Sequence, residues 1–423
     1  MSHESDSTKL GIMKTTIHTK KYWILVGTRP EVIKQVPLYL ELLKRFGKDQ
    51  VALIGTGQHK ELLKQALDHF GIEPDINLNI MTQDQSLVSS SAAVLEGIGQ
   101  LLRECSEKPE WVIVQGDTTT AAMAAWAAFQ SGVKVAHNEA GLRSYNLKHP
   151  FPEEANRKLI GTIADLHLAP TELARNALLK EGVSAQQVFI TGNTGIDALR
   201  WTLEQTEPES ICRLISQLQK DALTPVLVTA HRRENRSSME SWFKTLREFL
   251  NAHSDLALVC PMHPNQAAEE AARRFLGDLP RAHIRPAMNY AETCHLLKHC
   301  AFVVTDSGGI QEEASTLGVP VVVCRQTTER MEAVHEGIAL LAGNEPEKIY
   351  QGMLWAVGLS STASRIKTVT VKTSFSRNIF GNGFSATTIA DLLSSQWPSA
   401  NHKNQFPKNS GPADGFAVSS LIQ

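Results

Sequence analysis

The chain repeats one pattern along most of its length: a short run of β-branched and other apolar residues, followed by a segment with helical periodicity. Continuous apolar runs that alternate with amphipathic helices are typical of parallel strands covered on both faces. The pattern therefore predicts an α/β fold with a doubly wound sheet. The first set of runs is Trp23–Val26, Val51–Ile54, Trp111–Val114, Val133–Ala136 and Val188–Ile190.

A second set of apolar runs begins about thirty residues later. It comprises Pro225–Thr229, Leu256–Val259, Phe302–Thr305 and Val319–Val323. A chain of 423 residues is longer than one hydrophobic core usually organises, so two domains are expected. We predict two Rossmann-like domains whose parallel sheets face each other across a cleft. The predicted boundaries are 20–196 and 197–380 for the two domains, 381–396 for a helix that crosses back to the first, and 1–19 and 397–423 for disordered tails.

Charge and cysteine content restrict the partners and the compartment. Lys plus Arg number 42 and Asp plus Glu 44, a formal charge of -2, which gives no global basic field for nucleic acid or an anionic membrane. The six cysteines are scattered without metal-type or disulfide-type spacing, as expected in a reducing compartment. With no apolar stretch of the ~20 residues that span a bilayer, the sequence predicts a cytoplasmic protein that binds neither membrane nor nucleic acid.

The first predicted strand ends in Gly27-Thr28-Arg29-Pro30-Glu31, with Lys34 one helical turn later. Glycine permits a tight turn, proline suits the first turn of a helix, and a helix N-terminus beside Arg29 favours an anion. We expect Arg29 and Lys34 to contact a phosphate or carboxylate. A plain strand-to-helix turn with a surface arginine is the alternative.

Acidic residues follow the next predicted strands of the first domain. Asp117 and Glu139 each come directly after a buried run, and Glu153 begins a further helix. The carboxyl ends of parallel strands meet at one sheet edge, so these acids and the nearby Arg143 and Arg157 are expected to lie together. Clustered carboxylates suit acid–base catalysis because they shift one another's pKa values. The alternative is an ion-pair network with the two arginines.

The second domain carries anion-binding signals after its strands. His231 and Arg232 follow the first strand of this domain, and His263 follows the second. His231 is placed to assist a leaving phosphate and Arg232 or Arg233 to neutralise its charge. A capping or core histidine is the alternative. The Ser307-Gly308-Gly309 turn predicts an anion nest for a diphosphate, with Glu313 one helical turn on to accept hydrogen bonds from ribose hydroxyls.

Metal and nicotinamide chemistry have little support in the sequence. His295 and His299 stand at a spacing that could hold zinc, but their helix precedes a strand and has no glutamate between the histidines. The glycine-rich fingerprint of nicotinamide dinucleotide sites and the lysine of nucleoside-triphosphate loops do not occur at the first strand. We expect no metal and no cofactor.

Taken together and in order, eight motifs resemble the bacterial non-hydrolysing UDP-N-acetylglucosamine 2-epimerases. They are Gly27–Glu31, Gly57–His59, Gly116–Thr120, Glu139–Arg143, Pro152–Arg157, Thr191–Thr194, His231–Asn235 and Asp306–Glu313. The resemblance implies a GT-B fold, a homodimer without metal or nicotinamide, and a reaction in which UDP is eliminated to a 2-acetamidoglucal and then re-added.

The resemblance also implies roles for single residues. Asp117, Glu139 and Glu153 match the catalytic acids of the family, and His231 matches the histidine beside the leaving phosphate. The positions that match UDP-binding residues are Arg29, Lys34, Ser307, Gly308, Gly309 and Glu313. In some relatives the substrate is also an activator, and Gln58, His59 and Gln85 fall near that region.

Several segments differ from the usual family pattern, notably Ser144–Leu147, Met331 and Asn378–Gly383. They keep open a related UDP-sugar substrate, such as a 2,3-diacetamido uronic acid. A GT-B glycosyltransferase is a second alternative, although it has no use for three acids plus His231. A hydrolysing epimerase is disfavoured by Pro30-Glu31, and a non-catalytic sugar-nucleotide binder by the filled catalytic positions.

Overall fold

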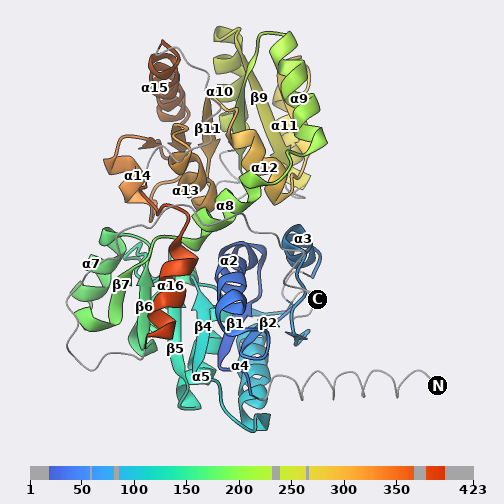
Figure 1. The fold of residues 1–423 in the computed structure, drawn as a ribbon. Helices are drawn as coiled ribbons and strands as arrows, with labels where there is room; N and C mark the ends of the chain where they lie inside the picture. Colours follow the sequence, from blue (N-terminus) through green and yellow to red (C-terminus); the bar gives the residue numbers. More distant parts are fainter. Residues whose placement is uncertain are drawn as a thin grey trace. The chain divides into compact units, whose positions relative to one another are not determined.

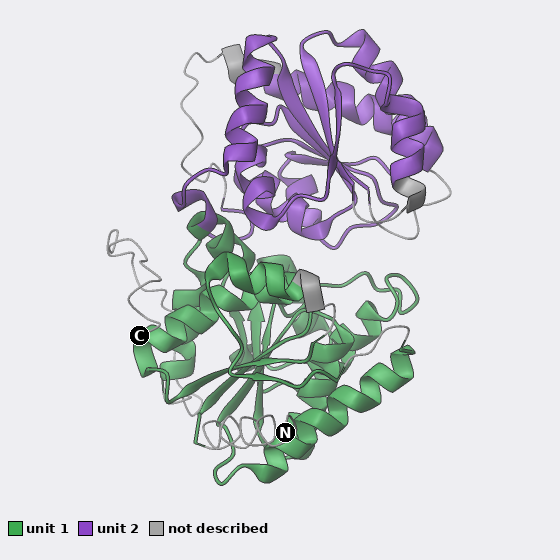
Figure 2. Ribbon diagram, turned by 90° about the vertical axis from the view of Figure 1, so that its right-hand side faces the viewer, with its two compact units in different colours: residues 1–201, 383–423 green, residues 202–382 purple. Residues whose placement is uncertain are grey.

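The computed structural model describes residues 19–57, 60–80, 85–230, 239–262, 266–365 and 378–395 (Figure 1). Within this part the chain forms two compact units, each with its own parallel sheet. Unit 1 extends to Trp201 and resumes at Gly383, whereas unit 2 comprises Thr202–Asn382 (Figure 2). The division falls inside one helix, α8 (Thr194–Glu204), so the first crossing between units is helical.

Unit 1 is built on a seven-stranded sheet in the order β3-β2-β1-β4-β5-β6-β7. Every adjacent pair is parallel. The strands are β1 (Tyr22–Val26), β2 (Val51–Gly55), β3 (Ile76–Asn77), β4 (Trp111–Gln115), β5 (Lys134–Asn138), β6 (Leu166–Ala169) and β7 (Val188–Ile190). The direction of strand addition reverses between β1 and β4, which is where ligands bind in sheets of this topology.

The helices of unit 1 connect these strands and cover the sheet (Figure 1). They are α2 (Arg29–Phe46), α3 (Lys60–Phe70), α4 (Leu87–Glu104), α5 (Thr119–Gln130), α6 (Glu153–Ile163) and α7 (Glu172–Lys180), with α16 (Ser385–Ser394) added from the end of the described chain. Residues of β1 and β4 such as Trp23, Val112 and Val114 are almost fully buried against the alanine-rich α5. Small side chains let this helix lie close to the sheet.

Unit 2 repeats the architecture with a six-stranded parallel sheet in the order β10-β9-β8-β11-β12-β13. The strands are β8 (Thr224–Thr229), β9 (Leu256–Met262), β10 (Ala282–Pro286), β11 (Phe302–Thr305), β12 (Val321–Val323) and β13 (Ala339–Leu341). The helices are α9 (Glu209–Lys220), α10 (Met239–Ala252), α11 (Gln266–Leu276), α12 (Tyr290–Leu297), α13 (Gly308–Thr316), α14 (Met331–His335) and α15 (Pro346–Arg365). Its reversal point lies between β8 and β11.

The predicted α/β class with two Rossmann-like sheets is confirmed, and each apolar run named from the sequence overlaps a strand. Four strands gave no comparable signal: β3, β6, β10 and β13. The strand β3 has two residues, and β6 and β10 contain histidine or arginine. Such strands are shaped by pairing with their neighbours more than by their own composition.

The helix α16 is held in unit 1 by the first crossing and by α2. Asp197 in α8 accepts hydrogen bonds from the backbone amides of Ser385 and Ala386 at 3.1 and 2.8 Å. Arg45 in α2 forms an ion pair with Asp391. These contacts anchor both ends of the returning helix. None of the described helices is long and apolar enough to cross a membrane.

Candidate functional site

Two loops meet where the sheet of unit 1 reverses. The loop after β1 begins at Gly27, and an added Cβ there would lie 2.5 Å from the Oγ1 of Thr120 and 2.7 Å from that of Thr56. The loop after β4 begins at Gly116, whose φ of +70° is a conformation that favours glycine. Glycine at both positions allows the two loops to pass close together at the carboxyl edge of the sheet.

Glu139 is placed at this edge by a left-handed residue conformation. It follows β5 with a φ of +63°, which is uncommon for a residue with a side chain. Its Oε2 accepts hydrogen bonds from Lys34 Nζ and from Gln115 Nε2, both at 2.5 Å. Glu139 and Lys34 are 7% and 8% exposed, so the lysine compensates a buried carboxylate that would otherwise be costly. Three separate elements, α2, β4 and β5, thus meet at one carboxylate.

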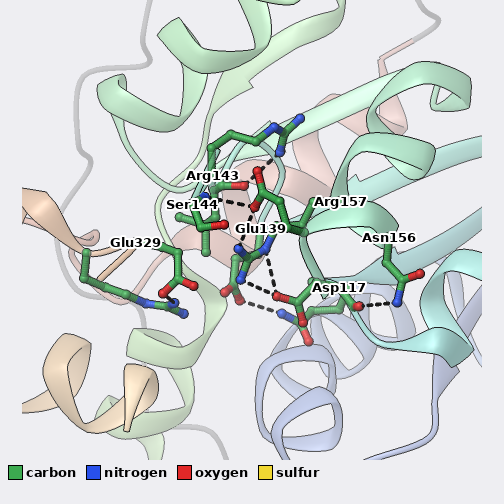
Figure 3. Close-up of polar contacts among 12 residues, drawn as sticks. Asp117, Glu139, Arg143, Ser144, Asn156, Arg157 and Glu329 are labelled. Atoms are coloured by element: carbon green, nitrogen blue, oxygen red, sulfur yellow. Dashed lines mark hydrogen bonds and ion pairs between the residues drawn. The ribbon is translucent and has the colours of Figure 1, made fainter. Parts of the chain in front are cut away.

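Asp117 is held by the first turns of α6. Arg157 donates to Asp117 Oδ2 from Nε at 2.9 Å and from Nη2 at 2.6 Å, and Asn156 Nδ2 donates to the Asp117 carbonyl oxygen at 2.8 Å (Figure 3). The side chain of Asp117 is 26% exposed. Asp117 thus takes part in the ion pair with Arg157 that was the alternative to a catalytic role. Its carboxylate is bonded through Oδ2 and partly exposed, so it can still contact a ligand.

The two glutamates that begin α6 have different surroundings. Glu153 is the first residue of the helix and is half-buried. Glu154 is fully buried and accepts from the backbone amides of Ser144 and Tyr145 at 2.9 and 3.0 Å. Arg157 Nη1 donates to the same carboxylate at 3.1 Å. Glu154 therefore shapes the loop after β5, while Glu153 is half-buried, with its Oε2 shielded from solvent.

The two arginines named from the sequence also differ. Arg157 joins Asp117, whereas the buried Arg143 binds Glu181, with Nη2 2.6 Å from Oε2. This pairing, first of all the hydrogen bond from Arg143, lowers the pKa of Glu181 below its ordinary value. The prediction that Arg143 contacts substrate stays untested, and its observed contacts tie the loop after β5 to the end of α7.

His137 is hydrogen-bonded to the loop that carries Asp117, and its imidazole is neutral. Its Nε2 lies 2.7 Å from the carbonyl oxygen of Gly116, and since a carbonyl only accepts, this nitrogen carries the proton. Burial, above all other causes, lowers the pKa of His137 to about 3. His137 is thus a core histidine, and His167, its register partner on β6, is buried in the same way.

Acid is therefore expected to destabilise unit 1 through His137. Between pH 6.5 and about 3, His137 is protonated in the unfolded chain and neutral in the folded chain. The free energy of unfolding therefore decreases as pH falls, by about 1.4 kcal/mol per pH unit. Chemical denaturation at pH 7.5 and pH 5 measures the difference. The His137→Asn variant, whose amide can still donate to Gly116, should lose about 2 kcal/mol less over this interval. Equal losses in both proteins would contradict this origin.

In unit 2 the turn after β11 presents the N-terminus of α13. The side chain of Thr305 bonds that of Thr229 on β8 at 2.6 Å and accepts from the Ser307 amide at 2.9 Å. Within the described chain, Ser307 makes no side-chain cap and the first turn of α13 holds no acidic residue. An added Cβ on Gly309 would meet no atom within 4 Å. This helix end is suited to an external anion.

A buried network of ion pairs connects the first turns of α13 to the loop after β12. Arg330 donates from Nε to Glu312 Oε1 at 2.8 Å and lies 3.3 Å from Glu329 Oε2, which Arg325 Nη1 also contacts at 3.0 Å. The Arg330 guanidinium lies against Gly308, where an added Cβ would be 2.8 Å from Cζ. The loop after β12 is thereby fixed to the first turns of α13.

Glu313 lies one turn into α13 and is 8% exposed. Its neighbour is the buried Tyr290, the first residue of α12. Burial raises the pKa of Tyr290, and Cys294 and Glu313 raise it further. The Glu313 carboxylate thus lies one turn from the N-terminus of α13 and beside Tyr290 of α12.

Gly308→Ala and Gly309→Ala should have opposite effects on stability. At Gly308 the new methyl group meets the pinned Arg330 guanidinium, so overpacking should lower the free energy of unfolding by about 1–3 kcal/mol. At Gly309 the space is open, and alanine should leave stability unchanged or raise it by up to about 1 kcal/mol. Urea denaturation of both variants tests this. Equal effects would mean that Arg330 moves aside at no cost.

Some predicted site residues lie outside the described part of the chain: Gln58, His59, His231, Arg232 and His263. Gln85 is described, half-buried, and directly precedes the Ser86 cap of α4. Arg29 is half-buried as the first residue of α2. Among the described residues, no cluster of three or more His, Cys, Asp or Glu side chains could hold a metal ion.

Sequence reasoning assigned no role to three residues that organise the site: Glu31, Gln115 and Glu181. Thr28-x-x-Glu31 forms a capping box, a pattern visible in the sequence. Gln115 ends β4, where a buried polar residue at a strand's carboxyl end is a signal for a site. The partner of Glu181 is 38 residues away, and no local pattern indicates it.

Comparison with known proteins adds independent information. The family model described as UDP-N-acetylglucosamine 2-epimerase matches residues 42–394. The UDP-N-acetylglucosamine 2-epimerase of Bacillus subtilis (strain 168) is 43% identical over 332 residues, which cover 78% of this chain and 85% of that protein.

Two solved structures resemble the model closely. The UDP-GlcNAc 2-epimerase of Neisseria meningitidis bound to UDP-GlcNAc superposes with a TM-score of 0.77 at 35% identity, over 88% of this chain and 99% of that one. The Methanocaldococcus jannaschii UDP-GlcNAc 2-epimerase in complex with UDP-GlcNAc and UDP gives 0.74 at 31% identity, over 88% and 99%. The likeness therefore extends across both units.

Proposed function

The chain belongs to the UDP-N-acetylglucosamine 2-epimerase family, a family of isomerases, and we propose that it interconverts UDP-GlcNAc and UDP-ManNAc without releasing free sugar. The observation that carries this proposal is the buried carboxylate of Glu139, held by Lys34 and Gln115 at the carboxyl edge of the sheet. Relatives solved with UDP-GlcNAc bound support the substrate class.

The proposed reaction proceeds by elimination and re-addition. A carboxylate base removes the proton from C2 of the sugar, the C1–O bond breaks with its electron pair going to UDP, and a C1–C2 double bond forms. A second acid then gives a proton to C2 from the opposite face, the C1–C2 double bond is lost, and the UDP oxygen forms the bond to C1. Because two proton transfers on opposite faces are required, more than one acid suits this chemistry, and Asp117, Glu139 and Glu153 are the proposed candidates.

UDP is assigned to unit 2. The first turn of α13 offers backbone amides to the diphosphate, with the Arg330 guanidinium beside Gly308, and Glu313 is placed to accept the ribose hydroxyls. His231 is proposed to assist the leaving phosphate, with Arg232 and His263 contacting the nucleotide. Arg29 adds a cation on unit 1, where Lys34 and Arg157 are engaged by acids.

The product, a UDP-ManNAc, suits the supply of precursors for cell-surface polysaccharide, and we propose a cytoplasmic homodimer for this role. The test of the function is product analysis after incubation with UDP-GlcNAc. UDP-ManNAc at equilibrium with the substrate is the expected result. Stoichiometric free N-acetylmannosamine and UDP would instead identify a hydrolase, and absence of turnover with UDP-GlcNAc but epimerisation of a 2,3-diacetamido uronic acid would identify the related substrate.

A further inference from the structure

Glu31 is a buried carboxylate that the proposed chemistry does not use. It lies in the first turn of α2 and is 1% exposed. Its Oε2 accepts from the backbone amides of Gly27 and Thr28 at 3.0 and 2.7 Å and from the Thr28 hydroxyl at 2.8 Å. Its Oε1 accepts from the Thr118 hydroxyl at 2.6 Å. The two amides can only donate and the two hydroxyls are able to, so all four can serve the ionised carboxylate. Burial raises the pKa of Glu31, and these four hydrogen bonds act in the opposite direction.

The two amides bound by Glu31 are those that a strand–turn–helix segment offers to an anion. In such turns the backbone N–H groups and the helix dipole attract phosphate or carboxylate from outside. Here an internal carboxylate occupies that place. In contrast, the first turn of α13 in unit 2 holds no acidic residue. The predicted contact of Arg29 with an external anion stays a prediction.

The same carboxylate joins the two loops at the reversal point of the sheet. Thr118, which donates to Glu31, directly follows Asp117 and caps α5 by accepting from the Ala121 amide at 3.0 Å. One turn beyond Glu31 on α2, Lys34 binds Glu139. Glu31 therefore joins α2, which also carries Lys34, to the loop that carries Asp117.

We propose that Glu31 is a positioning residue: its carboxylate acts as an internal anion that fills the amide turn after β1 and fixes it to the loop after β4, setting Lys34 and Asp117 in place. The proposal rests on the proposed epimerase function. Since most UDP contacts are assigned to unit 2 and only Arg29 to the turn that Glu31 fixes, loss of Glu31 should lower kcat far more than UDP affinity.

The test is chemical rescue of Glu31→Ala by formate, with chloride at the same ionic strength as reference. A misplacement of about 1 Å at reacting groups costs roughly 100-fold in rate, so kcat should fall by about that factor while the Kd for UDP changes by less than about threefold. Formate should restore kcat by about tenfold or more and raise the Tm of the variant. Glu41→Ala is the matched control. Glu41 is also a buried carboxylate of α2, 5% exposed, and its Oε1 lies 2.8 Å from Arg45 Nε. Formate should change neither the kcat nor the Tm of this control variant.

Each outcome decides the proposal. A kcat within about threefold of wild type, or a Tm and kcat that formate does not raise, overturns it, as does a rise in Tm without recovery of kcat. If Glu31→Ala fails to fold, Glu31→Gln replaces it: its amide oxygen can still accept from Gly27 and Thr28, and kcat should fall by about tenfold or more at unchanged UDP affinity. A wild-type protein that does not epimerise UDP-GlcNAc refutes the proposed function instead, and the formate-dependent Tm of Glu31→Ala then decides whether the turn is an anion site.

Discussion

Glu139→Gln is expected to lower kcat by a factor of about 10²–10⁴, the range that general acid–base groups contribute. The amide oxygen of glutamine can accept from Lys34 and Gln115 as the carboxylate does, so the surrounding geometry is retained. What is lost is the ability to take or return a proton. Steady-state kinetics with UDP-GlcNAc and calorimetric titration with UDP measure the two properties separately.

Affinity for UDP of Glu139→Gln should remain close to wild type, because most UDP contacts are assigned to unit 2. Its Tm should fall, because the buried Lys34 ammonium loses its counter-charge. Glu41→Gln serves as the reference, since it removes another buried carboxylate that is bonded to a cation in unit 1. Its kcat should be unchanged. If Glu139→Gln retains kcat within about tenfold, Glu139 is part of a structural ion pair and the base must be another acid.

Gly141→Ala is expected to have the largest effect on stability, about 3–5 kcal/mol. The residue has a φ of +91°, and an added Cβ would lie 2.1 Å from the carbonyl oxygen of Ala174 in α7. The turn is fixed to β6 by the backbone hydrogen bond from Ala140 N to Leu168 O, so it cannot move away from α7 without breaking that bond. Urea denaturation of the purified variant, or the absence of folded protein, measures the loss.

Gly132→Ala separates the clash from the backbone strain. Gly132 has a comparable φ of +70°, but an added Cβ there would meet no atom within 4 Å. This control should lose about 1–2 kcal/mol, the cost of the left-handed conformation alone. If the two variants lose the same free energy of unfolding, the close approach of the Glu139–Arg143 turn to α7 is not what requires glycine at 141.

The layers of the fold could be predicted because burial on both faces makes parallel strands nearly continuous apolar runs. Val112 and Val226, for example, lie in such runs and are fully buried. The order of the strands could not be obtained in this way. It depends on which edges pair, and β4 is a neighbour of β1 although about ninety residues separate them, as the register Tyr22 to Trp111 shows.

The candidate site shows the same division. Asp117 and Glu139 could be placed at a sheet edge because each follows a buried strand. Lys34 was predicted to bind substrate, and its observed contact is with Glu139, 105 residues away. This pair forms because β4 and β5 follow β1 in the sheet, an order that the sequence does not reveal. Arg143 and Arg157 have the same residue type and similar spacing to the acids, and their packing against Glu181 and Asp117 distinguishes them.

The central claim is that this chain breaks and remakes the C2–H bond of a UDP-sugar. Incubation with UDP-GlcNAc in D₂O, followed by proton NMR of C2, tests it most directly. We expect deuterium to enter C2 and UDP to remain attached to the epimerised sugar. Glu139→Gln should slow this exchange at least about 100-fold. A C2 proton that stays unexchanged while the wild-type protein binds UDP-GlcNAc would contradict this claim.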